Sequence, residues 1–547
     1  MIYITKLVIK NFKQFEDFEI KFNKDLNIIV GNNDAGKTTI IEAINLVITG
    51  VLNGRYVKNE ISEYLFNNNA IRNYLHNVKN DFSEELPKIE IDLFLDSDTE
   101  NISELKGKNN LLNEDACGIS YIIRFDEECS QLYFILLNSL REKNEKLNSL
   151  PLEYYHCIWQ TFAEGKINPR TFPLRTSVID SPTVRYRNGS DIYISKIIND
   201  SLSPVQNMNL NQAYRNLKDK FILDNSVSDI NSNIKNLYQP TKKDLSISAN
   251  MSVINSWEDI LVTCYDDVPF QQIGQGEQSL VKTALSLSKS KNNNYSNIVL
   301  IEEPENHLSH TKLKELLNII QTSTQNRQKI ITTHNSFVAN KLNLKNLIFL
   351  NEKKTLSFDR IGEQTQNFFE KMYTYDTLRM ILANKVIFVE GPSDELIVQK
   401  AFQIKYKKLA DDFGIDIIPV IRSAPRFLEI AKLLDKRIAV ITDNDGDYNK
   451  NIEVRYQNYK SASNIKIFSS SNDELNTLEP CFLDANSDNL DKIKEIVTSS
   501  SSVLTDFSSL NAYLQNHKSD WSLKIFETTE NVNMPDYIEE AVDWILN

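Results

Sequence analysis

The chain has 547 residues, of which 41% are apolar and 25% are charged, and its net charge is −13. This composition is typical of a globular protein with several domains, and the acidic balance argues against a protein that coats nucleic acid uniformly. No apolar run approaches the roughly 20 residues that span a bilayer. Five scattered cysteines without a C-x-x-C pair argue against a zinc ribbon or a disulfide framework. With no signal peptide at the N-terminus, we expect a cytoplasmic protein without membrane contact.

A phosphate-binding loop follows an early predicted strand. The motif G-x-x-x-x-G-K-T stands between a buried strand over 26–30 and an apolar helix over 39–47, which is the context that a P-loop requires. Backbone N–H groups would surround the phosphates, Lys37 would reach the β and γ phosphates, and Thr38 would give an oxygen to Mg²⁺. The predicted ATP-binding residues are Gly31, Asn32, Asn33, Asp34, Ala35, Gly36, Lys37, Thr38 and Thr39.

The sequence patterns on either side of the P-loop, up to residue 270, indicate secondary structure but no chemical motif as specific as the P-loop. Alternating or apolar runs predict strands over 3–9, 18–22, 89–95 and 120–125. The first two predict a hairpin. Residues 161–250 are polar and partly helical, with a helix expected over 213–223, and are interpreted as an insertion and dimerisation region. A cluster of arginines around Tyr186 is a candidate phosphate-binding surface, with single surface salt bridges as the alternative: Arg170, Arg175, Arg185 and Arg187.

Three further motifs come after residue 270. Gly274, Gly276 and Gln278 precede a helix predicted over 279–287, which would direct backbone amides towards an anion. An apolar strand then ends in Glu302 and Glu303, of which one carboxylate would hold Mg²⁺ and the other would polarise the attacking water. A strand over 329–333 is followed by His334, whose imidazole would reach the γ-phosphate or that water. Each motif alone also fits a structural role, and their combination with the P-loop favours the catalytic one.

In this order, the motifs resemble ABC-type ATPase heads of DNA-repair and chromosome-organising proteins. The resemblance implies that ATP lies between the P-loop of one subunit and the Gly274–Gln278 signature of another, so we expect a homodimer or a higher homo-oligomer. Two features depart from the family pattern: the acidic pair is Glu302-Glu303 instead of Asp-Glu, and the signature lacks its usual Ser-Gly. These departures bear on Mg²⁺ affinity and on hydrolysis rate more than on ATP binding.

Two acidic strand ends follow in the last third of the chain. The stretch VIFVEGPSDE is an apolar strand, a Gly-Pro turn and a helix start, so it places Glu390 at a strand end and Asp394 in the first helical turn. The stretch RIAVITDNDGD is a second strand, and residues two apart on a strand face one side, so Asp443 and Asp445 should point the same way. Repulsion among such carboxylates favours a divalent cation. Helix capping would explain Asp394 but leaves Glu390 unexplained.

These two stretches resemble the TOPRIM domain of topoisomerases, primases and a group of nucleases. An ABC-type head followed by a TOPRIM resembles the OLD family of ATP-dependent endonucleases, which includes nucleases of phage defence. The resemblance implies a site for two Mg²⁺ or Mn²⁺ ions that cuts nucleic acid. Its expected metal ligands are Glu390, Asp394, Asp443, Asp445 and Glu479, and its expected catalytic residues are Glu303, His334 and Lys518.

The predicted fold is α/β: an ABC-type P-loop ATPase head with a helical insertion, then a Rossmann-like TOPRIM domain. Predicted boundaries are 1–160 and 251–375 for the head, 161–250 for the insertion and 376–547 for the TOPRIM with its C-terminal helices. The resemblance implies an ATP-regulated endonuclease of antiphage defence, with a helicase or a reverse transcriptase and its DNA product as candidate partners. We expect DNA as the substrate, although a two-metal site can cut DNA and RNA equally well. The alternatives are an ATP-gated DNA scaffold with a silent TOPRIM and a TOPRIM nuclease toxin that cuts tRNA. No tyrosine is marked as a topoisomerase nucleophile, and the cysteines provide no primase zinc ribbon.

Overall fold

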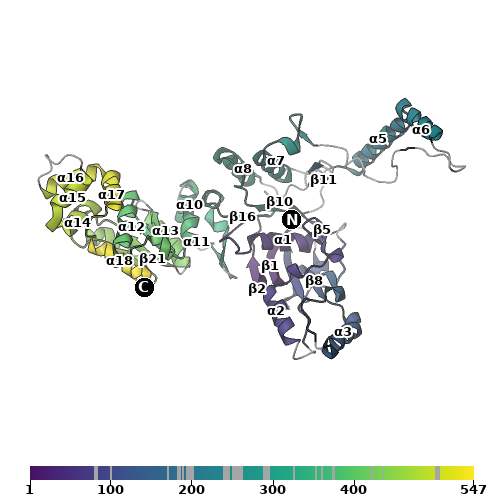
Figure 1. Ribbon diagram of the computed structural model, residues 1–547, viewed down its shortest axis with the longest axis horizontal. Helices are drawn as coiled ribbons and strands as arrows, with labels where there is room; N and C mark the ends of the chain where they lie inside the picture. The colour runs from purple at the N-terminus through teal and green to yellow at the C-terminus, as the bar shows by residue number, and fades with distance from the viewer. Residues whose placement is uncertain are drawn as a thin grey trace. The chain divides into compact units, whose positions relative to one another are not determined.

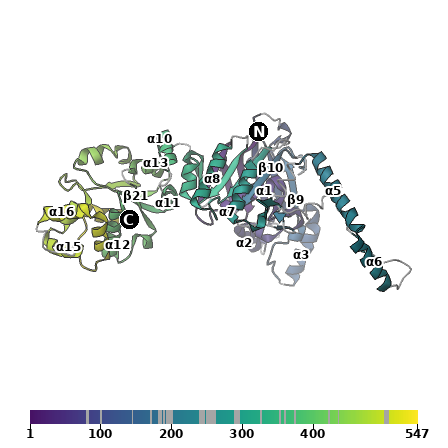
Figure 2. The same ribbon diagram turned by 90° about the horizontal axis from the view of Figure 1, so that it is seen from above.

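The computed structural model describes most of the chain, in the following ranges: 1–78, 84–98, 102–143, 145–168, 172–180, 186–187, 190–191, 202–237, 247–248, 263–287, 296–323, 327–351, 354–358, 361–372, 376–420, 423–434, 436–498 and 506–547. These residues form two compact units. The first consists of Met1–Ile29 with Gly36–Thr333, and the second of Val30–Ala35 with His334–Asn547 (Figures 1 and 2). Within the described ranges, no helix is long and apolar enough to cross a membrane.

An antiparallel sheet opens the first unit. Its strand order is β2-β1-β6-β8-β7, and β9 also pairs with β8. Buried and more exposed residues alternate along β2, as expected for a strand with one face in the core. The predicted hairpin and the strands at 89–95 and 120–125 are confirmed, each with longer bounds. The strands are β1 (Ile2–Phe12), β2 (Phe15–Lys21), β6 (Ile89–Ser97), β7 (Lys106–Gly107), β8 (Ala116–Phe125) and β9 (Tyr155–Thr161).

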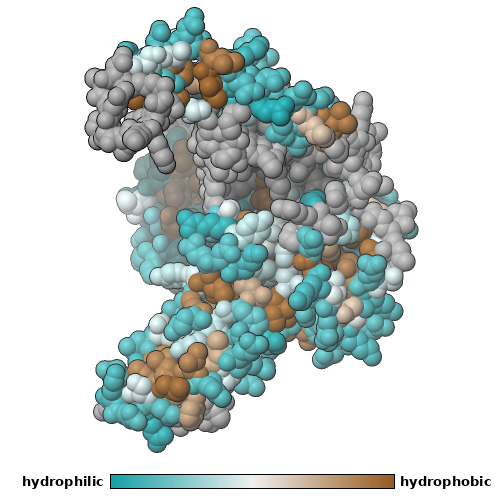
Figure 3. Space-filling model, turned by 90° about the vertical axis from the view of Figure 1, so that its right-hand side faces the viewer, coloured by the Kyte–Doolittle hydropathy of each residue, from teal (hydrophilic) through white to brown (hydrophobic). Residues whose placement is uncertain are grey.

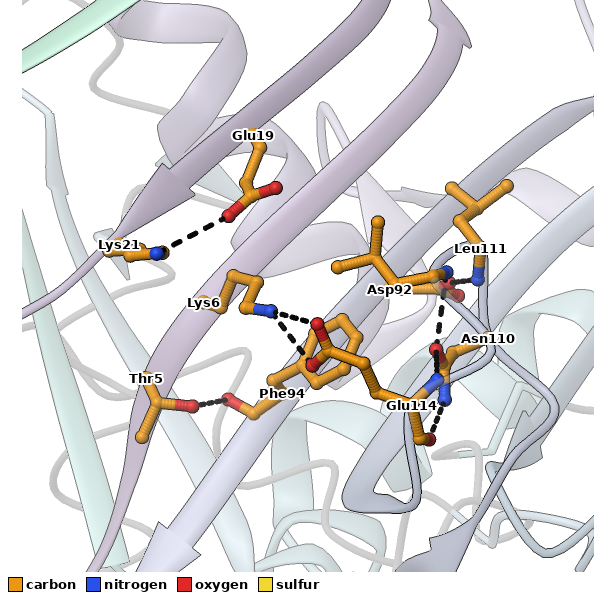
Figure 4. Close-up of polar contacts among 10 residues, drawn as sticks. Thr5, Lys6, Glu19, Lys21, Asp92, Phe94, Asn110, Leu111 and Glu114 are labelled. Atoms are coloured by element: carbon orange, nitrogen blue, oxygen red, sulfur yellow. Dashed lines mark hydrogen bonds and ion pairs between the residues drawn. The ribbon is translucent and has the colours of Figure 1, made fainter.

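A buried carboxyl lies inside this sheet (Figure 4). Asp92 on β6 is fully buried and accepts hydrogen bonds from the Leu111 backbone N–H and the Ser120 hydroxyl, both at 2.6 Å. Burial raises the pKa of Asp92 to about 7, against the effect of these donors. Nearby, Lys6 on β1 binds both carboxylate oxygens of Glu114 at 3.0 and 2.9 Å. The loop that carries Leu111 and Glu114 is therefore held against β1 and β6.

A second sheet of the first unit carries the nucleotide-binding motifs. Its strands β10, β15, β16 and β3 are neighbours in that order, and the pairs β10/β15 and β15/β16 are parallel. Helix α1 (Lys37–Thr49) contacts strands of both sheets. The predicted strand over 329–333 is confirmed with the same bounds. The strands are β3 (Leu26–Gly31), β10 (Leu174–Asp180), β15 (Ser296–Glu302) and β16 (Lys329–Thr333).

The first unit also contains several helices. Two of them, α5 and α6, lie in the predicted insertion, and α5 begins with a capping box in which the Ser203 hydroxyl accepts from the Gln206 backbone N–H. The predicted helix over 213–223 is the second half of α5. The main helices of the unit are α2 (Asn68–Asn77), α3 (Ser130–Glu142), α5 (Pro204–Ile222), α6 (Asn225–Leu237), α7 (Gln275–Leu287) and α8 (His310–Thr322).

The second unit contains a four-stranded parallel sheet with the order β20-β19-β21-β22. Its central strands β19 and β21 are almost completely buried, which explains their continuous apolar runs. Among the helices that follow the sheet in sequence, α18 packs on β21 and α17 on α12. The elements of the sheet are β19 (Lys385–Val389), α12 (Pro392–Tyr406), β20 (Ile415–Pro419), α13 (Ala424–Leu434), β21 (Arg437–Ile441) and β22 (Ile465–Phe468).

The remaining elements precede or follow that sheet. Within the described residues, five α-helices follow the sheet, and α17 begins at Lys518. The earlier elements are α9 (Ser336–Lys341), β17 (Leu347–Asn351), β18 (Lys354–Ser357), α10 (Glu363–Lys371) and α11 (Thr377–Leu382); the later ones are α14 (Leu478–Ala485), α15 (Leu490–Val497), α16 (Phe507–Asn516), α17 (Lys518–Glu527) and α18 (Asp536–Leu546).

Two local predictions are wrong. Helix α7 begins at Gln275, not at Ser279, so Gly276 and Gln278 lie within its first turn. Strand β21 ends at Ile441, and Asp445 has a left-handed backbone with φ of 49°. Because Asp443 and Asp445 lie beyond the strand, the alternation of a strand does not govern their side chains.

Candidate nucleotide-binding and metal-binding sites

The P-loop forms a tight turn between β3 and α1. Gly36 has φ of 104°, and a Cβ there would lie 2.4 Å from the Gln14 and Phe15 side chains, so this position requires glycine. At Gly31, a Cβ would lie 2.7 Å from the Leu350 carbonyl oxygen. Inside the loop, the Ala35 backbone N–H donates to the Asn32 carbonyl at 3.2 Å. Asn32, Asn33 and Asp34 are exposed, which leaves this part of the loop open to a ligand.

The residues proposed to hold Mg²⁺ at the nucleotide lie together. The Thr38 hydroxyl at the start of α1 donates to Glu302 Oε1 at the end of β15. Lys37 is buried, whereas the neighbouring Thr38 is exposed. A hydroxyl and a carboxylate at hydrogen-bond distance are an oxygen pair of the kind that Mg²⁺ prefers.

Glu303 has an unusual backbone. Its φ is 43°, and its N–H donates to the Thr332 carbonyl on β16 at 2.9 Å. The Asn306 amide donates to Glu303 Oε2 at 2.9 Å, which orients the carboxylate. A left-handed non-glycine residue costs free energy and is often retained at functional sites. His334 directly follows β16 and is exposed.

The signature residues differ in environment. Gly274 is exposed and precedes α7, and a Cβ there would meet no atom within 4 Å. Gly276 faces the His307 carbonyl oxygen, which would lie 2.6 Å from a Cβ. The Gln278 side chain is only 4% exposed, and its amide donates to the Ile273 carbonyl at 3.0 Å. Gln278 therefore fixes the turn before α7.

In the second unit, the carboxyl ends of β19 and β21 bring two acidic residues together. Glu390 follows β19, and its Oε1 accepts from the Thr442 hydroxyl at 2.6 Å and from the Asp443 backbone N–H at 3.1 Å. Because β19 and β21 are adjacent parallel strands, these ends meet at one edge of the sheet. Thr442 thus orients Glu390 beside Asp443.

Asp443 lies in an acidic cluster with three other carboxylates. Burial raises its pKa to about 9, and the charges of Asp394, Glu390 and Glu479 add to the rise while Lys518 opposes it. Burial and then the charge of Glu390 raise the pKa of Asp394 to about 7. Asp394 also accepts from the Gly391 backbone N–H at 3.0 Å, which fixes it at the start of α12. Without a cation, this cluster is therefore partly protonated at neutral pH.

Glu479 joins the cluster from α14. Its side chain is 1% exposed, its Oε2 accepts from the Thr477 hydroxyl at 2.8 Å, and its Oε1 lies 3.2 Å from Lys518 Nζ. Partial burial lowers the pKa of Lys518, but the charge of Glu479 and their hydrogen bond outweigh this, so the pKa is raised. Residues that are 39 positions apart in the sequence therefore form a cation–carboxylate pair beside the cluster.

Asp445 lies in a different environment from the four carboxylates of the acidic cluster. Its side chain is exposed, and its backbone N–H donates to the Asn476 carbonyl at 3.1 Å. The loop around it is built by Asn444, which the sequence analysis missed. The buried Asn444 amide donates to the Ser470 and Asn472 carbonyls, both at 2.9 Å. The sequence signal for an asparagine that holds this loop was its position between two acidic residues, Asp443 and Asp445.

The donor set fits a hard divalent cation. The cluster consists of carboxylate oxygens with hydroxyl neighbours, which are the groups that Mg²⁺ and Mn²⁺ bind. Among the described residues, no three acidic, histidine or cysteine side chains already stand at the spacing of a metal centre. Several of the carboxylate oxygens accept hydrogen bonds from protein donors instead, so metal binding requires local rearrangement of side chains.

The arginine cluster is only partly described. Arg175 lies on β10 and is half-buried, and Arg187 lies on β11 (Tyr186–Arg187). Arg170 and Arg185 lie outside the described residues, so the predicted phosphate-binding surface stays a prediction.

The fold and these sites define the class: a P-loop ATPase joined to a TOPRIM nuclease domain. The AAA ATPase domain family matches residues 2–339, and the OLD-like TOPRIM domain (overcoming lysogenization defect protein-like) matches residues 381–445. The chain belongs to the AAA ATPase domain family, and its second unit contains a region similar to the OLD-like TOPRIM domain. The fold class predicted from the sequence is confirmed. An ATPase domain and a TOPRIM domain also imply the use of a nucleotide and of a divalent metal.

Three individual proteins illustrate what the chain is similar to. Endonuclease GajA of Bacillus cereus (strain HuB5-5) is 21% identical over 87% of this chain and 82% of its own length. The DNA replication and repair protein RecF of Acetivibrio thermocellus is 51% identical over 49 residues, which are 9% of this chain and only 13% of that protein. Among solved structures, the C-terminal region of the Burkholderia pseudomallei OLD protein matches 30% of this chain and 97% of its own, with 16% identity and a TM-score of 0.25.

Proposed function

We propose that this chain is an ATP-regulated, divalent-metal-dependent endonuclease that hydrolyses phosphodiester bonds of DNA. The observation that carries the proposal is the acidic cluster of Glu390, Asp394, Asp443 and Glu479, in which burial and then the neighbouring carboxylate charges raise the pKa of Asp443 to about 9. A cluster that is unfavourable when ionised is stabilised by bound cations. Asp445 is proposed as a further, outer ligand because it lies in the same loop as Asp443.

The residues of the cluster have distinct proposed roles. A pair of bound Mg²⁺ or Mn²⁺ ions would activate water and stabilise the leaving oxygen. Thr442 keeps Glu390 oriented beside Asp443, so these two carboxylates approach the ligand from adjacent strand ends. Lys518, whose cation lies next to Glu479, is proposed to neutralise charge on the scissile phosphate.

The ATPase motifs have proposed roles as well. The P-loop residues 31–39 bind the phosphates, and Thr38 with Glu302 holds the nucleotide's Mg²⁺, which their hydrogen bond supports. Glu303 polarises the attacking water, and His334 contacts the γ-phosphate. Gly274, Gly276 and Gln278 act on the nucleotide of a partner subunit. In this role the buried Gln278 shapes the turn, and the amides near Gly274 face the phosphate.

The insertion is proposed to contribute to the dimer that such a shared site requires. Helix α5 carries exposed apolar side chains, Val205, Met208, Leu217 and Phe221, which are between 60% and 71% exposed. Apolar patches interrupt the hydrophilic surface on the face shown in Figure 3. Exposed apolar side chains on one helix favour association with another subunit.

The family resemblance supports a role in antiphage defence, with a helicase or a reverse transcriptase and its DNA product as candidate partners.

One experiment distinguishes the proposed DNA endonuclease from the two alternative functions, an RNA toxin and a DNA scaffold. Supercoiled plasmid, single-stranded DNA and total tRNA are incubated with the full chain and Mg²⁺ or Mn²⁺, with and without ATP. We expect cutting of DNA that responds to ATP. Cutting of tRNA alone would identify an RNA toxin, and DNA binding without cutting would identify a scaffold.

A further inference from the structure

Helix α9 connects the strand-end histidine to the rest of the second unit. It begins at Ser336, two residues after His334, and the Asn335 side chain caps it by accepting from the Phe337 backbone N–H at 2.9 Å. A nucleotide contact at His334 would therefore act directly on the first turn of α9, since the cap leaves no flexible segment between them.

Helix α11 is fastened to α9. Asp376, at the start of α11, accepts from the Ser336 hydroxyl, and that hydroxyl accepts from the Leu378 backbone N–H at 3.1 Å. Thr377 donates to Asn340 Oδ1 at 2.5 Å, and both residues are fully buried. Breaking a buried hydrogen bond costs more than breaking an exposed one, because water does not replace the lost partner. The two short helices should therefore move together.

The other end of α11 is fastened to the TOPRIM sheet. Arg379 Nε donates to Asp416 Oδ1 on β20 at 2.9 Å. Lys436, directly before β21, donates to the carbonyls of Ile381 and Ala383 at the end of α11. The chain then enters β19 at Lys385. Strands β19 and β21 end immediately before Glu390 and two residues before Asp443, respectively.

We propose that α11 is the connector through which nucleotide binding at the ATPase motifs changes the geometry of the TOPRIM carboxylates. This inference rests on the proposed function of both sites and adds the route between them. The connector holds α9 with Thr377 and holds the TOPRIM sheet with Arg379. A shift of α9 is thus passed to the two strands whose ends carry Glu390 and Asp443.

The test compares Thr377→Val and Arg379→Gln with wild type. ATP turnover and nucleotide-free cutting should stay near the wild-type values, because neither residue lies in a site. In wild type, a non-hydrolysable ATP analogue should change the cutting rate about fivefold or more, the lower range of typical allosteric coupling. In both variants that ratio should fall towards one. Wild-type ratios in both variants would overturn the connector.

Lys405→Gln is the matched control. Lys405 and Asp543 form an ion pair at 2.7 Å with side-chain exposures of 36% and 43%, close to the 38% and 33% of Arg379 and Asp416. Removing this pair should leave the nucleotide response unchanged. A control that lost the response as fully as Arg379→Gln would show a general loss of rigidity and would also overturn the connector.

A second readout separates the connector from the proposed nuclease. If wild type cuts none of the substrates, the nuclease proposal fails, and Mn²⁺ affinity measured by calorimetry replaces cutting. The analogue should then change Mn²⁺ affinity in wild type and in Lys405→Gln but not in Arg379→Gln. Equal Mn²⁺ affinity of wild type with and without the analogue would overturn the connector independently of catalysis.

Discussion

Lys518 Nζ lies 3.2 Å from Glu479 Oε1, and the two side chains differ greatly in exposure, at 54% and 1%. The lysine is thus the accessible member of the pair, and the glutamate is the buried one. A cation placed this way can turn towards a bound phosphate without exposing Glu479, provided that a metal ion takes over the neutralisation of the carboxylate.

Replacing Lys518 should lower the rate of nucleic-acid cutting without weakening Mn²⁺ binding. In Lys518→Gln, the cutting rate should fall by about 10²-fold or more, as expected for loss of an electrostatic stabiliser. Mn²⁺ should bind at least as tightly as in wild type, because a competing positive charge is gone. Calorimetry and cleavage on the same preparation measure both. Reduced thermal stability with unchanged cutting would mean that the pair is only structural.

Replacing Asp443 should stabilise the metal-free protein. Asparagine resembles the protonated carboxyl, so folding of Asp443→Asn at pH 8 no longer requires uptake of a proton by a group whose pKa is about 9. The melting temperature without metal should rise, and stabilisation by Mn²⁺ should vanish. Asp488→Asn, an exposed acid of the same unit, is the control and should change neither value. A lower melting temperature for Asp443→Asn would contradict the acidic cluster.

The metal-free protein should lose stability as the pH rises. The pKa values of Asp394 and Asp443 are raised to about 7 and about 9, so these two carboxyls hold more protons in the folded chain than in the unfolded chain above pH 4. The free energy of unfolding therefore declines between about pH 4 and pH 9. Mg²⁺ should oppose the decline, and its affinity should increase with pH. Urea titrations at several pH values, with Mg²⁺ or EDTA, test this; a parallel decline in both would contradict it.

Glu302, the last residue of β15, and Glu303, which follows it, should have separable effects on ATP binding and hydrolysis. Glu303→Gln should bind ATP but hydrolyse it about 10²-fold more slowly or worse, the usual contribution of a positioned base. Glu302→Gln should weaken Mg²⁺-dependent ATP binding, because it replaces the carboxylate beside Thr38 with a neutral amide, which binds Mg²⁺ less strongly. Lys37→Ala should abolish binding. ATP turnover and nucleotide binding are measured separately, and equal turnover of Glu303→Gln and wild type would reject the assignment of Glu303.

The apolar side chains of α5 should hold subunits together. In the variant with Leu217→Ser and Phe221→Ser, the dimer should dissociate at higher protein concentration than in wild type, while the helix content stays the same because both side chains are exposed. Leu132→Ser with Phe134→Ser on α3 is the matched control, since these side chains are 58% and 59% exposed. Sedimentation velocity measures the shift. Equal dissociation in both variants would contradict a specific role of α5.

Much of the fold was predictable because local patterns carry it. The apolar runs of β3, β16 and β19 indicated the positions of these strands, since buried parallel strands have little tolerance for polar residues. The placement of Glu390 after β19 followed from the same pattern, because Gly391 and Pro392 end the strand.

The rest depends on contacts that local patterns do not contain. The pair of Lys518 and Glu479 joins two different helices, and the pair of Arg379 and Asp416 joins α11 to β20. The orientation of Asp445 was predicted wrongly because its loop is set by the buried Asn444, whose carbonyl partners lie 26 and 28 residues away. Tertiary hydrogen bonds thus override the alternation that a strand would impose.

The acidic cluster is tested most directly as a nuclease site by Mn²⁺-dependent cleavage of supercoiled plasmid. Wild type, Asp443→Asn and Asp488→Asn are compared at equal concentration. Circular dichroism spectra and ATP turnover are recorded for each protein. We predict that wild type and Asp488→Asn cut, and that Asp443→Asn does not cut although it keeps its fold and its ATP turnover. Cutting by Asp443→Asn at the wild-type rate would contradict the account and place the nuclease site elsewhere in the chain.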